Sequence, residues 1–229
     1  MKIGVLLSGC GVYDGSEIHE SVFTLLAIEE NGAEAICFAP DKDQAHVINH
    51  IDGSVEQGEK RNVLKESARI ARGNIKSINK TSIDDFDALV IPGGFGAAKN
   101  LNRWAFEGPD GDIDPAVKHL IIDMISAKKP IAALCMGPTV IAKALQGSGI
   151  GTKLTVGTNK EKSPYDIKEI SDGMESLGVM SVMKTIDEIC YDEENKIVTA
   201  PCYMMQASIS QVRINTKQAI DKLISIIKK

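Results

Sequence analysis

The chain has 229 residues, of which 43% are hydrophobic and 25% are charged. These fractions are those of globular proteins and exclude wholesale disorder, and the length suits one large domain or two small ones. The formal net charge of −5 and the aromatic content of 4% argue against a nucleic-acid binder, which needs a basic surface and stacking side chains.

The chain begins with a predicted strand, turn and helix. An apolar run predicts a buried strand at residues 3–7, and the glycine-rich segment 8–15 predicts a turn after it. A helix is predicted over residues 17–30, with Asp14 or Ser16 as its N-cap. Its apolar positions recur at helical spacing and are Ile18, Val22, Leu25 and Leu26.

The middle of the chain repeats this alternation. Strands are predicted at residues 33–39 and 88–91, and helices at 61–71 and 115–127, the second of which starts with a proline that suits a first helical turn. The strand at 88–91 ends abruptly at Pro92-Gly93-Gly94-Phe95-Gly96. Apart from the helix at 61–71, residues 41–80 are polar and irregular.

A fourth core strand is predicted at residues 130–134, and Cys135-Met136-Gly137-Pro138 leads from it into a helix that ends near Leu145. The later expected elements are a strand at 153–156, a helix at 165–177, an extended segment at 179–183, a hairpin with strands 186–191 and 197–200 around a turn at 192–195, and a C-terminal helix at 206–228.

No linker, repeat or low-complexity stretch divides the chain, so we expect one domain over residues 1–229. Strands that alternate with helices predict right-handed crossovers and therefore an α/β fold, with a mostly parallel sheet and helices on both faces. Ligands of such sheets bind at the carboxyl ends of the strands. The candidate site therefore lies among residues 8–20, 92–98 and 135–138.

We expect neither a targeting segment nor a membrane span. The longest apolar runs, such as 3–7 and 131–134, are too short to cross a bilayer, so no membrane association is expected. Leu7-Ser8-Gly9-Cys10 resembles a lipoprotein cleavage box, but the short stretch before Cys10 is better explained as a strand that ends in a turn. These observations predict a cytoplasmic protein.

Cysteine usage singles out one residue. The five cysteines are widely spaced and form no C-x-x-C motif, which predicts free thiols in place of a zinc ribbon or a disulfide framework. Cys135 follows a strand and precedes a helix, the layout of a nucleophile elbow, and the helix N-terminus is expected to lower its pKa. The alternative is a buried, inert thiol. Cys37, Cys190 and Cys202 are interpreted as structural, and Cys10 as a residue that could flank the site.

Two further groups lie at the strand ends. The amides of Gly94 and Met136 could hold an oxyanion, and Gly93 lets the backbone approach a ligand, although such glycines can also serve a turn alone. Glu17, His19 and Glu20 start the first helix. A carboxyl near a thiol in a half-buried cleft keeps its proton and can act as general acid and base, but each of the three could instead be solvated or capping.

Four segments spread over nearly the whole chain carry a family resemblance. They are residues 7–20 (LSGCGVYDGSEIHE), 37–41 (CFAPD), 91–101 (IPGGFGAAKNL) and 195–199 (NKIVT). They resemble the PfpI branch of the class I glutamine-amidotransferase-like superfamily, and within it the ElbB-type glyoxalases, also described as isoprenoid-biosynthesis proteins with an amidotransferase-like domain. The resemblance implies a flavodoxin-like sandwich, a homodimer, Cys135 as nucleophile, and Glu20 as its partner with Glu17 as the fallback.

The function implied by this resemblance is a glyoxalase III-like lyase that needs no cofactor and no metal ion. It would convert small dicarbonyls such as glyoxal and methylglyoxal into 2-hydroxy acids, and its activity could also be observed as repair of early glycation adducts. One departure is informative. PfpI-type peptidases carry a His directly after the nucleophile, where this chain has Met136, and no His follows His119, so a Cys-His dyad is disfavoured.

Three features of the sequence suggest alternative functions or sites. A thiol redox sensor or accessory protein linked to isoprenoid metabolism is compatible with an activated Cys135 and the missing His. A dinucleotide-binding fingerprint at Gly9-Cys10-Gly11 fails at its third glycine, where Asp14 stands. His46 and His50 have a spacing that suits a metal, but no third ligand is near in sequence, so they are interpreted as surface residues.

Overall fold

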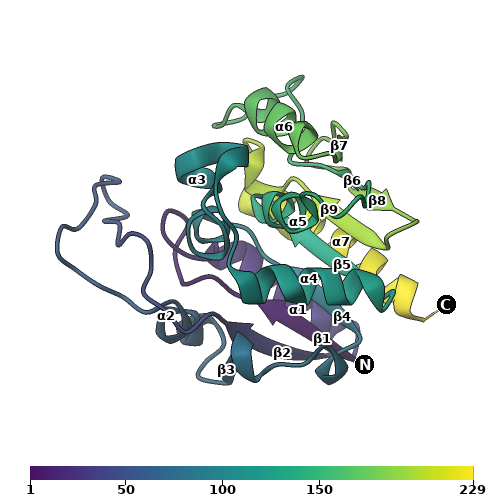
Figure 1. The fold of residues 1–229 in the computed structure, drawn as a ribbon, viewed down its shortest axis with the longest axis horizontal. Helices are drawn as coiled ribbons and strands as arrows, with labels where there is room; N and C mark the ends of the chain where they lie inside the picture. Colours follow the sequence, from purple (N-terminus) through teal and green to yellow (C-terminus); the bar gives the residue numbers. More distant parts are fainter. Residues whose placement is uncertain (229) are drawn as a thin grey trace.

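A seven-stranded sheet forms the centre of the protein in the computed structural model, which describes residues 1–228 (Figure 1). Its strands are β1 (Lys2–Leu6), β2 (Glu34–Ala39), β3 (Ile75–Ser77), β4 (Ala88–Ile91), β5 (Ile131–Leu134), β8 (Cys190–Asp192) and β9 (Ile197–Ala200). The spatial order is β3-β2-β1-β4-β5-β9-β8, and all pairs are parallel except β8 with β9. Strands β6 (Lys153–Leu154) and β7 (Met180–Ser181) form a separate two-stranded parallel sheet.

Helices cover both faces of the main sheet (Figure 1). On one face α1 (Ile18–Glu30) packs against α7 (Ile209–Ile227), and on the other α4 (Pro115–Ser126) packs against α5 (Gly137–Leu145). The remaining α-helices are α2 (Val63–Ile70), α3 (Trp104–Glu107) and α6 (Ile167–Ser176). The predicted α/β fold, one domain with a mostly parallel sheet between helices, is confirmed.

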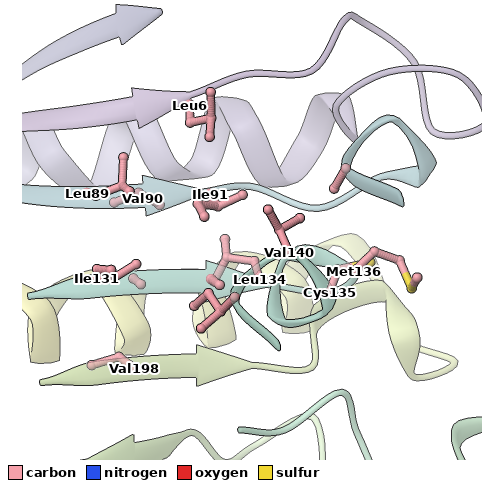
Figure 2. Packing of buried hydrophobic residues seen from close by; sticks show 14 of the residues in the cluster. Leu6, Leu89, Val90, Ile91, Ile131, Leu134, Cys135, Met136, Val140 and Val198 are labelled. Carbon is pink, nitrogen blue, oxygen red and sulfur yellow. The ribbon is translucent and has the colours of Figure 1, made fainter. Parts of the chain in front are cut away.

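The central strands form the core because they are buried on both faces, as parallel strands between helix layers must be. Side chains such as Leu89, Ile131 and Val198 are fully buried. Figure 2 shows them on the neighbouring strands β4, β5 and β9, with Cys135 and Met136 immediately beyond the end of β5. The core therefore holds the end of β5 in a fixed position.

The direction in which successive strands are added to the sheet reverses between β1 and β4, although the two strands are parallel. From β1 the chain moves outward to β2 and β3, and then returns to place β4 on the other side of β1. Loops leave such a switch point in opposite directions and open a crevice between them. Backbone hydrogen bonds join the two loops here: Glu17 N donates to Gly93 O, Phe95 N to Val12 O, and Gly96 N to Gly15 O, at 2.8–2.9 Å.

Most predicted elements are present with ends moved by a few residues, but three details differ. The N-cap of α1 is Glu17, whereas Asp14 and Ser16 are used elsewhere: Asp14 accepts from Ile48 N, and Ser16 Oγ accepts from Ser8 N. The first strand of the predicted hairpin is shorter than expected, since β8 covers only Cys190–Asp192. The short elements β3 and α3 carry too little periodicity to be predicted.

The apolar stripe that predicted α1 does not face the core. Ile18, Val22 and Leu26 are 44%, 46% and 38% exposed, and Leu25 is only partly buried. The buried face of α1 instead consists of Glu20, Ser21, Thr24, Ala27 and Ile28. The helix is rotated in this way because Glu20 is bonded to the backbone at the ends of β4 and β9.

No helix within residues 1–228 has the length and apolar character needed to cross a membrane.

Candidate active site

Cys135 lies at a sharp turn between β5 and α5. Its φ is +53°, a left-handed value that few residues other than glycine adopt. The turn is held by the pairing of β5 with β9, through a bond of 3.0 Å from Cys135 N to Ala200 O, and α5 begins directly after Met136, whose side chain makes no capping hydrogen bond. Strained backbone of this kind clusters at functional sites, because surrounding structure must maintain it.

Glu20 is the carboxyl that the fold brings to this thiol. Its side chain is fully buried and contacts the Cys135 side chain. One carboxyl oxygen accepts from Gly93 N at 3.0 Å and the other from Tyr203 N at 3.2 Å. Three strand ends, those of β4, β5 and β9, therefore meet around one carboxyl group.

Gly93 is required by close packing at this point. A Cβ atom on residue 93 would collide with the Cys135 side chain and with the Glu20 carboxyl. Because its N–H is bonded to Glu20, Gly93 has no free amide for an oxyanion. The neighbouring amides of Gly94 and Met136 do face the Cys135 sulfur.

The electrostatics of the pair are dominated by burial. Burial and the neighbouring Glu17 raise the pKa of Glu20 to about 8, although bonds from the amides of Tyr203 and Gly93 oppose the shift. Burial and the Glu20 charge likewise raise the pKa of Cys135 well above its usual value. The amides of Gly94 and Met136 lower this pKa, as expected for a helix N-terminus, but the expectation of a net decrease is wrong because desolvation is larger.

Glu17 and His19 lie beside this pair without replacing Glu20. Glu17 accepts from Glu20 N at 2.7 Å and so caps α1, and burial raises its pKa. His19 is about half exposed, and its Nδ1 lies 2.9 Å from the Tyr203 hydroxyl and 3.9 Å from a Glu17 oxygen. Both residues belong to the rim of the site.

Cys10 points to a different part of the molecule. It is half-buried after β1, where burial and Glu66 of α2 raise its pKa and Arg69 of α2 lowers it. Its surroundings are therefore those of α2, not of Cys135.

Sequence reasoning missed the contribution of β9 to the site. Tyr203 supplies an amide to Glu20 and a hydroxyl to His19. Cys202, interpreted as structural, is fully buried with a φ of +48°, and its sulfur lies 3.6 Å from Thr216 Oγ1. The sequence does not show that β9 pairs with β5. Because the two strands are parallel neighbours, the residues after β9 must lie beside Cys135.

Tyr165 was also missed, and it lines two pockets of similar volume. One, of about 310 Å³, is lined by residues that include Glu17, His19 and Tyr203. The other, of about 320 Å³, is lined by residues that include Phe95 and Met136. Burial is the main cause that raises the pKa of Tyr165 to about 12, and Cys135 and Glu20 add to it. The two pockets therefore share one tyrosine, and neither Cys135 nor Glu20 is among the residues that line them.

No group of three or more His, Cys, Asp or Glu side chains within residues 1–228 is arranged to hold a metal ion. His46 lies edge-on to Phe106, with ring centroids 5.1 Å apart. His50 Nε2 accepts from Tyr13 N at 3.3 Å and lies 3.8 Å from Asp14. His46 and His50, the i, i+4 pair, therefore each contact neighbouring side chains or backbone within the protein.

Comparison with known proteins decides the family. The model of the DJ-1/PfpI family matches residues 14–202. The chain belongs to this family. A crystal structure of an isoprenoid biosynthesis protein with an amidotransferase-like domain from Ehrlichia chaffeensis is 33% identical, with a TM-score of 0.87 over 99% of this chain and 100% of that one. Drosophila melanogaster DJ-1beta has a TM-score of 0.57 at 16% identity, over 99% of this chain and 95% of that one, and so shares the fold.

Two curated relatives extend over almost the whole chain. The human glutamine amidotransferase-like class 1 domain-containing protein 3, mitochondrial, is 39% identical and covers 98% of this chain and 83% of its own length. The rat ES1 protein homolog, mitochondrial, is 38% identical and covers 98% and 84%. These names contradict the predicted cytoplasmic location, and that prediction is wrong. It rested on free thiols and missing membrane spans, which do not distinguish one reducing aqueous compartment from another.

Proposed function

We propose that this member of the DJ-1/PfpI family is an ElbB-type glyoxalase, a lyase that converts 2-oxoaldehydes into 2-hydroxy acids with Cys135 as nucleophile. The observation that carries the proposal is the buried contact between Cys135 and Glu20 beside the amides of Gly94 and Met136. A thiol, a proton carrier and two amide donors at one point are the groups that this isomerisation needs.

The first step forms a bond between the Cys135 sulfur and the aldehyde carbon. Ionised Glu20 accepts the thiol proton as the sulfur attacks, and the amides of Gly94 and Met136 stabilise the oxyanion. Return of the proton to that oxygen gives a hemithioacetal. Glu20 is again a carboxylate and can accept a second proton.

The second step is an internal oxidation and reduction. Glu20 removes the proton from the carbon bonded to sulfur, which gives an enediolate, and then returns this proton to the neighbouring carbon, while the hydroxyl proton on the sulfur-bearing carbon passes to the oxygen of that neighbouring carbon. The sulfur-bearing carbon is oxidised to a thioester and its neighbour is reduced to an alcohol, so the reaction needs no external electron carrier. Water then cleaves the carbon–sulfur bond and releases the 2-hydroxy acid and the thiol.

The direct test replaces the nucleophile. In Cys135→Ala, conversion of glyoxal into glycolate should fall to the background rate, because no thioester can form. Cys37→Ala is the matched control, since Cys37 is buried in β2, away from the strand-end site. Equal turnover by the wild type and Cys135→Ala would reject the assignment. Comparing a preformed glycation adduct, with and without a trap for free aldehyde, distinguishes adduct repair from scavenging.

A second candidate, a thiol redox sensor or accessory protein of isoprenoid metabolism, is favoured by one observation. The raised pKa of Glu20 keeps its carboxyl protonated at neutral pH, and such a group can donate to an oxidised Cys135. Mild hydrogen peroxide followed by mass spectrometry tests this. Selective oxidation of Cys135 together with negligible dicarbonyl turnover would favour the sensor over the enzyme.

We also propose a homodimer, as the family resemblance implies. The exposed stripe of Ile18, Val22 and Leu26 on α1 supports it, because contiguous apolar surface on a soluble protein often marks an interface. Val22→Glu should convert the dimer into a monomer in light scattering, whereas Val55→Glu, at another partly exposed valine, should not. A wild type that is monomeric at every concentration would reject the proposal.

A further inference from the structure

The pocket on the α3 side of Tyr165 has a composition that small dicarbonyls do not require. It measures about 320 Å³, within the range of sites that enclose whole organic ligands. Its wall is mainly apolar and aromatic, and Glu169 is the one charged residue among those that line it. The main apolar lining residues are Phe95, Trp104, Phe106, Met136, Tyr165 and Ile170.

Two residues that line this pocket directly follow reactive groups in the sequence. Met136 follows Cys135, and Phe95 follows Gly94, so two lining residues come directly after the nucleophile and after one amide donor. Tyr165 is common to this pocket and to the one lined by Glu17 and His19. The chamber is therefore lined by residues that directly follow the reactive groups, and its Tyr165 lies close enough to Cys135 and Glu20 for their charges to raise its pKa.

The walls of the chamber are held by their own packing. The rings of Phe95 and Tyr165 meet edge to face, with centroids 5.5 Å apart. Trp104 packs so closely on α6 that a Cβ at Gly173 would lie 3.0 Å from its ring. Aromatic walls fixed in this way are preorganised for a flat apolar group, because binding requires little further ordering.

We propose that the substrate of this site is a 2-oxoaldehyde whose keto carbon carries an apolar group the size of an aromatic ring. The inference rests on the function proposed above and corrects the expectation that the site has no need of aromatic surfaces. The chemistry is unchanged: the aldehyde carbon becomes the thioester and then the carboxylate, and the keto carbon becomes the alcohol. The ring lies in the chamber throughout and gains binding energy by leaving water.

Phenylglyoxal is the probe, with mandelate as its product, and glyoxal is the reference. The ratio of kcat/KM for phenylglyoxal to that for glyoxal should be at least about 10 in the wild type, since one well-placed apolar group is worth roughly 10- to 200-fold. Ala105→Leu places a larger side chain in the chamber from an exposed position and should lower this ratio about tenfold. Ala127→Leu, at an exposed alanine beyond the end of α4, is the matched control and should leave the ratio unchanged.

Binding of the products provides a measurement that does not depend on turnover. Mandelate should raise the Tm of the wild type more than glycolate does, and Ala105→Leu should abolish the difference. Turnover of glyoxal with an equal or lower rate for phenylglyoxal would overturn this inference and leave the proposed function standing. Turnover of neither aldehyde would overturn the proposed function, and the mandelate measurement would then decide whether the chamber binds aromatic groups at all.

Discussion

Two buried carboxyl groups, which lie at opposite ends of the strands, have pKa values shifted in opposite directions. Asp192, at the end of β8, accepts from Thr152 Oγ1 at 2.6 Å, from Asn195 Nδ2 at 2.9 Å, and from the backbone N–H groups of residues 153, 194 and 195. Burial raises the pKa of Asp192, but these bonds together bring it below its ordinary value. Glu20 has only two backbone donors and a second carboxyl beside it, and its pKa rises to about 8.

The difference shows how the fold separates a structural carboxylate from a reactive one. A buried carboxylate surrounded by donors is stable as an anion and has no tendency to accept a proton. A buried carboxyl with few donors exchanges its proton near neutral pH, which suits a general acid and base.

The largest expected effect is on catalysis. Glu20→Gln keeps the shape of the side chain but cannot accept the thiol proton, so turnover should fall about 10²- to 10⁴-fold. Asp192→Asn, the same chemical change at the other carboxyl, should alter turnover less than twofold. Measurement of glycolate formation by both variants checks this, and similar losses in the two would remove the distinction between the carboxyls.

The second effect is on stability and its dependence on pH. Because the folded pKa of Glu20 is about 8 and lies above the unfolded value near 4.5, the folded state holds the extra proton between these pH values. Wild-type stability should therefore fall as pH rises through this window, by at most about 4 kcal/mol. Glu20→Gln removes this loss, so urea unfolding should show the variant to be the more stable protein at pH 9 and the two to be similar near pH 5. A variant less stable at pH 9 would contradict the raised pKa.

Asp192→Asn should destabilise the folded protein, whereas Glu20→Gln should stabilise it at high pH. The amide group of Asn cannot accept all the bonds that the carboxylate receives, and at least one buried donor would lose its partner. The free energy of unfolding at pH 7 should fall by about 1–3 kcal/mol in urea. Unchanged stability would mean that these hydrogen bonds contribute no more than the amide replaces.

The contrast between the carboxyls also explains what the sequence could predict. Cys135 was predicted because its turn is local: strand, thiol, glycine and helix follow one another in the chain. Glu20 was favoured over Glu17 through family resemblance, and the geometry that distinguishes them is non-local. It depends on Gly93 and Tyr203, the second of which is 183 residues away along the chain.

The α1 helix shows the limit of hydrophobic periodicity. Ile18, Val22 and Leu26 predicted the helix correctly, yet they lie on its exposed side. Periodicity reports that an apolar face exists, but it does not say what covers that face. The buried polar contacts of Glu20 determine the orientation of the helix, and they are not encoded in a local pattern.

The smallest predicted effect concerns Glu17, the carboxyl beside Glu20. Turnover in the wild type should rise with pH around a midpoint near 8, because only ionised Glu20 accepts the thiol proton. Glu17 raises the pKa of Glu20, so Glu17→Gln should move this midpoint to lower pH by up to about one unit. The helix cap should survive, since the Gln side-chain oxygen can still accept from Glu20 N. The measurement is a pH profile of kcat/KM for the variant. A midpoint at lower pH with an unchanged plateau would show that Glu17 adjusts the pKa of Glu20. A collapse of the plateau would make Glu17 the proton carrier and Glu20 its neighbour.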